Sequence, residues 1–248
     1  MILLKNENQI DGIRKSCKLL AQLFEELLPQ VKDGMSTKDI DDICVAFIKK
    51  HKGIPAWYSQ DFAGAACISI NDEVIHGIPR KDIFVKNGDI VSLDIGIDLN
   101  GFYSDAARSI IVGEGSPEAK KLVQVTKNCL AAGIEACVVG NRISDISKAV
   151  YEVADKEGYG VVYDYCGHGV GLKVHEDPSI PNLPGRGPNP RIRPGMVLAI
   201  EPMINLGTAD VDICDDGWTV VTSDGKISAH QENTVAIFED HTEILTVL

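Results

Sequence analysis

The sequence predicts an α+β fold built from two halves, each with helices on one face of an antiparallel sheet. Three observations support this prediction. Apolar residues recur at helical spacing in four segments, β-rich runs with tight turns follow each pair of helices, and the order helix, helix, strands occurs twice along the 248 residues. A cleft between the two halves is the expected place for a functional site.

The first half begins with two predicted helices. Apolar residues at every third or fourth position form one stripe over residues 10–27. Ser36 and Asp39 then form a capping-box pattern, which starts a second helix. The sequence next turns to β-rich runs at residues 67–70, 90–98 and 102–112.

The second half repeats this order. Ser116 before Pro117 is typical of a helix start, and Ser144 is expected to cap the following helix. Gly34 and Asp39-Ile40 recur 106 residues later as Gly140 and Asp145-Ile146. This recurrence favours an internal duplication, but so few identities also leave a chance match open.

The proline-rich segment at residues 177–195 differs from the rest of the chain. It holds six of the eleven prolines, and proline is excluded from regular helix and from central strands. We therefore expect an ordered surface loop there.

Composition limits the classes of function. Lys and Arg number 24 against 36 Asp and Glu, a net charge of −12 that phosphate backbones and anionic membranes would repel. Neither nucleic-acid nor membrane binding is expected, and no apolar run is long enough to span a bilayer. The seven cysteines form no C-x-x-C pair and are interpreted as reduced thiols. These features predict a cytoplasmic protein.

Asp94 lies in an apolar run that should be a buried strand, where a lone carboxylate is costly unless it is paired or binds a metal. From Asp94 alone, an aspartate that caps a loop at the strand end is an equal alternative. The turn Asn100-Gly101 predicts a hairpin that sets Asp94 opposite Ala107 and Asp105 opposite Gly96. The two carboxylates then share a face as diagonal neighbours about 7–8 Å apart. That gap suits one divalent cation or two.

The remaining charged residues strengthen the metal hypothesis. A salt bridge from Arg108 to Asp105 is the simpler alternative, but alternation along the strand points Arg108 to the opposite face. Glu201 ends another apolar strand, and Glu232 precedes a further one. His168 stands between glycines that leave its imidazole open. Four carboxylates at strand ends and one open histidine, spread over both halves, are difficult to explain by packing alone.

Eight motifs together resemble those of the type I methionine aminopeptidases, in order along nearly the whole chain. The motifs are His76-Gly77-Ile78-Pro79, Ser92-Leu93-Asp94-Ile95-Gly96, Tyr103-Ser104-Asp105, Cys166-Gly167-His168-Gly169-Val170-Gly171, His175-Glu176-Asp177-Pro178, Glu201-Pro202-Met203, Asp216-Gly217-Trp218-Thr219 and His230-Gln231-Glu232-Asn233-Thr234. The resemblance implies the pita-bread (creatinase/aminopeptidase-like) fold, with duplicated halves, antiparallel sheet and outer helices. It also implies a single catalytic metallopeptidase domain over residues 1–248, with halves of about 1–112 and 113–248.

The same resemblance implies a hydrolase, a methionyl aminopeptidase that removes the N-terminal methionine from nascent proteins and peptides by a two-metal activated water. The resemblance further implies that the enzyme prefers substrates whose second residue is small. The implied cofactors are two divalent ions (Co, Mn, Fe or Zn). Five residues would bind them: Asp94, Asp105, His168, Glu201 and Glu232.

Each catalytic role is also carried over from the resemblance. Asp105 and Glu232 would bridge the ions, and Glu201 would act as base for the attacking water. His76 would hydrogen bond and deliver a proton near the scissile amide, and His175 would stabilise the oxyanion. We interpret the other histidines as structural or surface residues: His51, His230 and His241.

The pocket for the methionine side chain departs from the common bacterial pattern. Cys67, Phe62 and Trp218 match its positions, but Val174 stands where phenylalanine is frequent. This change predicts a wider, less aromatic pocket. Trp57 and Tyr58 are candidates to fill the space, or are ordinary core residues.

Two alternatives remain. Xaa-Pro dipeptidases or aminopeptidases share the fold and a similar five-ligand site, but they usually carry Glu-Pro-Gly where this chain has Glu201-Pro202-Met203. A catalytically dead binding protein would have lost metal ligands, and this chain keeps all five. We expect a monomer whose partners are nascent polypeptide N-termini at the ribosome.

Overall fold

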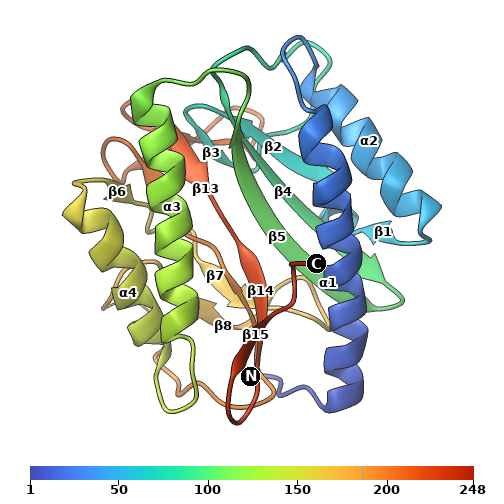
Figure 1. Cartoon of the computed structure of the whole chain (residues 1–248), viewed down its shortest axis with the longest axis vertical. Helices are drawn as coiled ribbons and strands as arrows, with labels where there is room; N and C mark the ends of the chain where they lie inside the picture. Colours follow the sequence, from blue (N-terminus) through green and yellow to red (C-terminus); the bar gives the residue numbers. More distant parts are fainter. Residues whose placement is uncertain (186) are drawn as a thin grey trace.

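The computed structural model describes residues 1–185 and 187–248, and it has the predicted α+β architecture (Figure 1). Helices α1 and α3 lie in front of the strands in this view, with α2 and α4 at the outer edges. The α-helices are α1 (Glu7–Leu27), α2 (Thr37–Lys50), α3 (Pro117–Ala136) and α4 (Ile143–Lys156). Two short 3-10 helices are η1 (Leu28–Gln30) and η2 (Ala56–Gln60).

The helix starts follow local capping chemistry, with one exception. Ser36 accepts the Asp39 amide and Asp39 accepts the Ser36 amide, which confirms the predicted capping box of α2. The prediction that Ser144 caps α4 is wrong, because Arg142 is the N-cap residue. Asp145 accepts the Arg142 amide at 2.7 Å. The Ser144 amide instead donates to the Asn189 side chain at 3.0 Å.

The first sheet confirms the predicted hairpin and its register. It contains β1 (Ile54–Pro55), β2 (Ala66–Ile70), β4 (Ile90–Leu99) and β5 (Phe102–Ile111). Asp94 lies opposite Ala107 and Asp105 opposite Gly96. The turn Asn100-Gly101 has positive φ at both residues, 58° and 81°, as a tight two-residue hairpin loop requires.

Three further antiparallel sheets contain the remaining strands. The five-stranded sheet has the order β15-β14-β9-β7-β8, with β7 (Gly167–Gly169), β8 (Glu176–Ile180), β9 (Val197–Ile200), β14 (Asn233–Ile237) and β15 (Thr242–Ile244). The second has the order β13-β10-β6, with β6 (Gly160–Val161), β10 (Met203–Asn205) and β13 (Ser228–His230). The third has the order β11-β12-β3, with β3 (Glu73–Ile75), β11 (Val211–Ile213) and β12 (Val220–Thr222).

The proline-rich segment is only partly the predicted loop. Residues up to Ile180 belong to β8, so the loop prediction is wrong for that part. Pro178 fits there because β8 lies at the edge of its sheet, where an amide is not needed for a further strand. Residue 186 of the segment lies outside the described residues.

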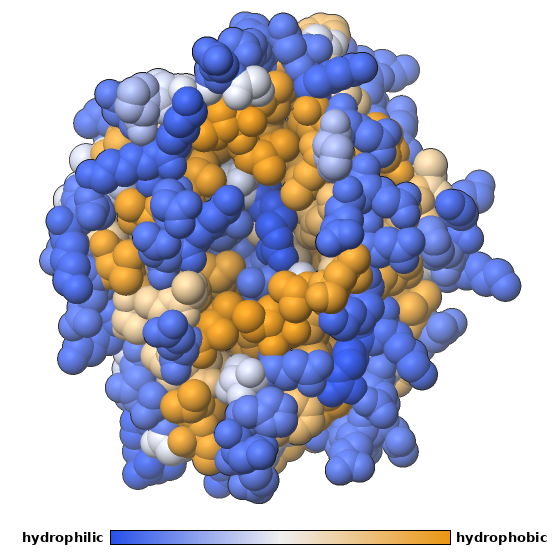
Figure 2. Space-filling view, in the orientation of Figure 1, coloured by the Kyte–Doolittle hydropathy of each residue, from blue (hydrophilic) through white to orange (hydrophobic). Residues whose placement is uncertain are grey.

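Two large hydrophobic cores divide the molecule near residue 112. One packs α1 and α2 on the first sheet and draws its buried members from residues 20–112. The other lies under α3 and α4 and draws all but Ile90 from residues 119–237. Hydrophobic side chains gather in the trough between α1 and α3 (Figure 2). The duplication of the halves stays a prediction.

None of the helices in the described part of the chain is long and apolar enough to cross a membrane.

Candidate metal centre

The predicted site residues all line one cavity of about 620 Å³. They come from both halves of the chain: Phe62, Cys67, His76, Asp94, Asp105, His168, His175, Glu201, Trp218 and Glu232. The sequence therefore identified residues that the tertiary structure brings together.

Strand register explains how the carboxylates of the two halves meet. Within the first sheet, Asp94 pairs with Cys67 on β2 and with Ala107 on β5. The Glu232 amide donates to the Ala107 carbonyl at 3.0 Å, and the Thr234 hydroxyl donates to the Asp105 carbonyl at 2.7 Å. These bonds connect β5 to the start of β14, so Glu232 lies beside the two aspartates.

The strand β9 positions the fourth carboxylate, that of Glu201, beside the other three. Ile200 pairs with Asn233, so Glu201 follows β9 at the end where Glu232 precedes β14. His168 pairs with Ala199 on the other side of β9. Its Nε2 is 3.5 Å from Oε1 of Glu201.

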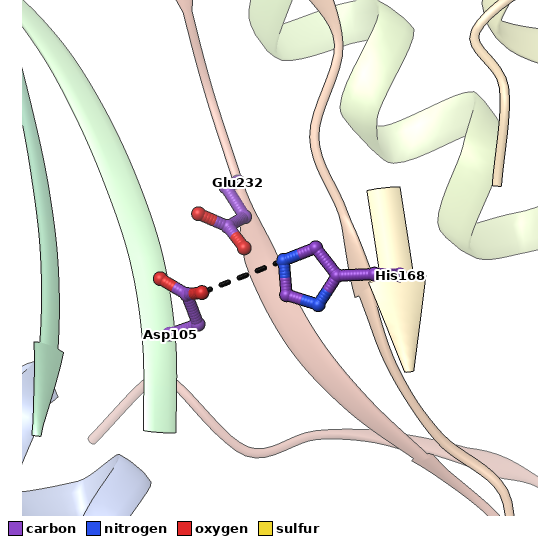
Figure 3. Close-up of side chains that lie close together, drawn as sticks. All are labelled: Asp105, His168 and Glu232. Atoms are coloured by element: carbon purple, nitrogen blue, oxygen red, sulfur yellow. Dashed lines mark ion pairs between the residues drawn. The ribbon is translucent and has the colours of Figure 1, made fainter. Parts of the chain in front are cut away.

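Asp105, His168 and Glu232 form a cluster of potential metal donors (Figure 3). One ligand atom from each lies within 4.8 Å of the others, and His168 Nε2 is 3.6 Å from Asp105 Oδ2. The Nδ1 of His168 is 2.9 Å from the Gly169 carbonyl. A proton on Nδ1 donates to that carbonyl, so the Nε2 lone pair faces the carboxylates, as a metal ligand requires.

Burial makes the ionised carboxylates unstable without a counter-charge. It raises the pKa of Asp94 to about 7 and that of Glu201 to about 8. Burial, followed by the neighbouring carboxylates, raises the pKa of Asp105 and of Glu232 well above the usual values. These carboxylates therefore stay ionised at neutral pH only beside a positive partner, and without one they take up protons.

Among the described residues, protein groups do not supply that partner. Oδ1 of Asp94, Oδ1 of Asp105 and Oε1 of Glu232 are buried without a hydrogen-bond partner. Arg108 donates instead to the carbonyls of Ala107 and Glu232 and to neighbouring groups. Since oxygen donors with one imidazole suit divalent cations, the donor set fits metal binding.

The two remaining predicted histidines stand at the wall of the cavity. The His175 ring centroid is 4.4 Å from that of His168. His76 adopts a φ of 60°, an uncommon backbone state for a residue with a side chain. A Cβ on Gly77 would lie 2.2 Å from the Ile68 carbonyl oxygen, so glycine is required beside it. Burial lowers the pKa of His76 to about 4 and also lowers that of His175, which keeps both imidazoles neutral at pH 7.

An apolar wall borders the carboxylates. Phe62, Cys67, Trp57 and Val174 pack in one buried cluster with Trp218 against it. The rings of Phe62 and Trp218 meet edge to face at 5.3 Å. Burial raises the pKa of the Cys67 thiol well above its usual value, so it acts as an apolar surface.

The sequence left open whether Trp57 and Tyr58 fill the pocket or belong to the core. Trp57 lines the cavity, and its indole N–H donates to the Asp94 carbonyl at 3.2 Å. Tyr58 is exposed and takes no part.

His230 is the residue that sequence reasoning missed. Its side chain is only 1% exposed, and its Nε2 lies 3.5 Å from Oε2 of Glu201. The sequence held a signal, because His230 lies only two residues from Glu232, which was already assigned to the site. His51 at the end of α2 and the exposed His241 are as expected.

Comparison with known proteins agrees with this geometry. The family model for metallopeptidase family M24 matches residues 11–239. A methionine aminopeptidase of Treponema pallidum is 57% identical over 99% of this chain and 96% of its own length. The crystal structure of a methionine aminopeptidase from Thermotoga maritima has a TM-score of 0.97 and 40% identity, with full coverage of both chains.

The rival class is also similar in fold. An X-Pro aminopeptidase structure from Thermotoga maritima has a TM-score of 0.78 at 22% identity, and the match covers 99% of this chain and 62% of that one. At that identity the likeness extends to the pita-bread fold alone.

The fold, the cluster of buried ligands and the family match define a metallopeptidase. Within family M24, this chain belongs to the methionine aminopeptidases, which match it over its full length at up to 57% identity.

Proposed function

We propose that this enzyme removes the N-terminal methionine from peptides and nascent proteins, with a preference for a small second residue. The observation that carries the proposal is one cavity in which buried, unpartnered carboxylates stand beside an apolar wall. The carboxylates suit the reacting end of a substrate, and the wall suits a methionine side chain.

The residues proposed to hold two divalent ions are Asp94, Asp105, His168, Glu201 and Glu232, with Asp105 and Glu232 as bridges. Four carboxylates balance the charge of two dications, which supports the count of two. Co, Mn, Fe and Zn all suit such donors, and availability selects among them. When bound, the ions lower the pKa of the attacking water and hold the substrate's free α-amine and scissile carbonyl.

Three side chains of the cavity are proposed to transfer protons or donate hydrogen bonds during the reaction. Glu201 accepts the proton of the attacking water, a role that suits a carboxylate lining the cavity beside the other proposed ligands. Neutral His175 donates a hydrogen bond to the developing oxyanion. His76, which is neutral at pH 7, hydrogen bonds near the scissile amide and passes to the leaving nitrogen the proton that Glu201 takes from the water. Its ring centroid lies 5.6 Å from that of Tyr165 and 6.2 Å from that of Trp218, and these contacts orient the ring.

Substrate selection follows from the shape of the cavity. Phe62, Cys67 and Trp218 accept the long unbranched thioether of methionine. The second residue has to pass the rim near His76 and His175, so glycine, alanine and serine are favoured there. Val174 relaxes the first position modestly, because a misfit of one methylene in such a pocket is worth only about 1–3 kcal/mol.

The cellular setting belongs to the same proposal. We place the enzyme in the cytoplasm as a monomer that acts on N-termini emerging at the ribosome. The free state of the seven cysteines in the described chain supports a reducing compartment. A single catalytic domain with halves near 1–112 and 113–248 is supported by the two separate hydrophobic cores.

The deciding experiment compares Met-Ala-Ser with Ala-Pro after metal reconstitution. We expect hydrolysis of Met-Ala-Ser, slower hydrolysis of Met-Leu-Ser and none of N-acetylated Met-Ala-Ser. Preference for Ala-Pro would favour the Xaa-Pro class instead. Metal binding without hydrolysis of either peptide would favour a binding protein on this fold.

A further inference from the structure

His230 is a buried imidazole whose hydrogen-bonding groups lack partners. Both ring nitrogens are buried without a hydrogen bond to any described residue. Leaving such groups unsatisfied in the interior costs free energy, and a leucine of similar size would avoid that cost. Its presence therefore calls for a partner that forms in the working enzyme.

The backbone of His230 is fixed by two neighbouring strands, β5 and β10. The Ser109 hydroxyl donates to the His230 carbonyl at 2.8 Å, and the His230 amide donates to the Ser109 Oγ at 2.8 Å. His230 also pairs with Met203 in the sheet of β10 and β13. The main chain is thus held by β5 and β10 together, and the side chain, only 1% exposed, is enclosed by its surroundings.

The nearest acidic atom is Oε2 of Glu201, 3.5 Å from His230 Nε2. The other oxygen of the same carboxylate, Oε1, lies 3.5 Å from Nε2 of His168. Glu201 thus stands between two imidazoles, with one oxygen assigned to each. His168 lines the cavity, whereas His230 does not.

We propose that His230 is a positioning residue, whose Nε2–H donates to Oε2 of Glu201 and fixes the orientation of Oε1 toward the metals and the substrate. The inference rests on the proposed metal centre and adds a residue to it. A shift of about 0.6 Å brings the pair to the length of a charge-assisted hydrogen bond.

The contact with Glu201 also determines which ring nitrogen of His230 carries the proton. A neutral imidazole carries one N–H, and the carboxylate acceptor selects the tautomer that bears it on Nε2. The ring therefore orients Glu201 without neutralising the charge that the metals require.

Three variants separate positioning from simple packing. In His230→Gln the side-chain amide nitrogen reaches about as far as Nε2, so the hydrogen bond survives. In His230→Asn the amide reaches only the place of Nδ1, and in His230→Leu there is no donor. The exposed His241 provides a matched control as His241→Gln.

The experiment is calorimetric titration of the metal-free proteins with Mn²⁺ and Co²⁺, followed by steady-state kinetics on Met-Ala-Ser. We expect His230→Leu and His230→Asn to weaken metal affinity and to lower kcat by about ten- to a hundredfold, with KM little changed. His230→Gln should stay within about threefold of the unmodified protein, as should His241→Gln. Thermal melts of each metal-free variant check that it is folded.

Two outcomes overturn the proposal. One is wild-type metal affinity in His230→Leu, and the other is equal damage in His230→Gln and His230→Leu. Failure of the unmodified protein to bind any metal would instead refute the proposed function itself, so the two failures are distinguishable.

Discussion

Metal removal should make the stability of this protein fall as the pH rises. In the metal-free protein, burial raises the pKa of Glu201 to about 8, whereas the unfolded chain has a pKa near 4.3. Between these values the folded state binds the extra proton, so its stabilisation is lost as the pH rises through 8. From pH 7 to 8.5, Glu201 alone removes about 1 kcal/mol from the free energy of unfolding.

The other buried carboxylates act in the same direction, because burial also raises the pKa values of Asp105 and Glu232 well above the usual values. The histidines of the site contribute little in this window, since burial lowers the pKa of His168 to about 3 and that of His76 to about 4. For a chain of this length, 1 kcal/mol corresponds to about 2–4 °C in the melting temperature. The metal-free protein should therefore melt at least that much lower at pH 8.5 than at pH 7.

Divalent metal should abolish this slope and raise the midpoint. A ligand at a hundredfold excess over Kd stabilises the folded state by about 2.7 kcal/mol, provided that it binds only that state. Calorimetric melts with chelator and with Mn²⁺ or Co²⁺ measure both effects. Glu201→Gln should reduce the pH dependence of the metal-free protein, while the exposed Glu239→Gln should leave it unchanged. A metal-free midpoint that rises with pH, together with no response to metal, would refute this account of the site.

Three further predictions concern individual side chains. Glu232→Gln should lose bound metal and activity together, whereas His76→Ala should keep the metal and lose most of kcat, as metal analysis and kinetics would measure. Val174→Phe should narrow the pocket and lower kcat/KM for Leu-Ala relative to Met-Ala by about tenfold. Lys5→Met should cost about 3–5 kcal/mol in urea unfolding, because the 2.6 Å ion pair with Glu176 is buried. Adding Glu176→Gln should recover much of that loss.

Each of these predictions has a result that would contradict it. Equal metal loss in the Glu232 and His76 variants would mean that the two residues are not divided between binding and proton transfer. Unchanged selectivity in the Val174 variant would remove that residue from the pocket. A Lys5 variant as stable as the unmodified protein would show that the buried pair contributes nothing, and the exposed Lys148, 3.8 Å from Glu152, offers a matched surface pair for comparison.

The sequence by itself determined the local elements. Helical stripes, the Ser36 and Ser116 caps and the Asn100-Gly101 turn depend on neighbours within a few residues, so their patterns were readable along the chain. The hairpin also fixed the register of Asp94 and Asp105, because side-chain alternation follows directly from strand pairing. The residues proposed as metal ligands and the two cavity histidines were identified as a set through motifs that resemble those of a known family.

Only the tertiary structure determined which residues far apart in the sequence come into contact. Thr234 and Asp105 are bonded although they are 129 residues apart in the sequence, and that contact brings Glu232 to the aspartates. At the start of α4 the N-cap is Arg142, and the Ser144 amide donates to the side chain of Asn189, which is 45 residues away in the sequence. The sequence led us to interpret His230 as a structural or surface residue, whereas packing buries it against Glu201. Such contacts depend on how sheets and helices assemble, and no local spacing or propensity encodes them.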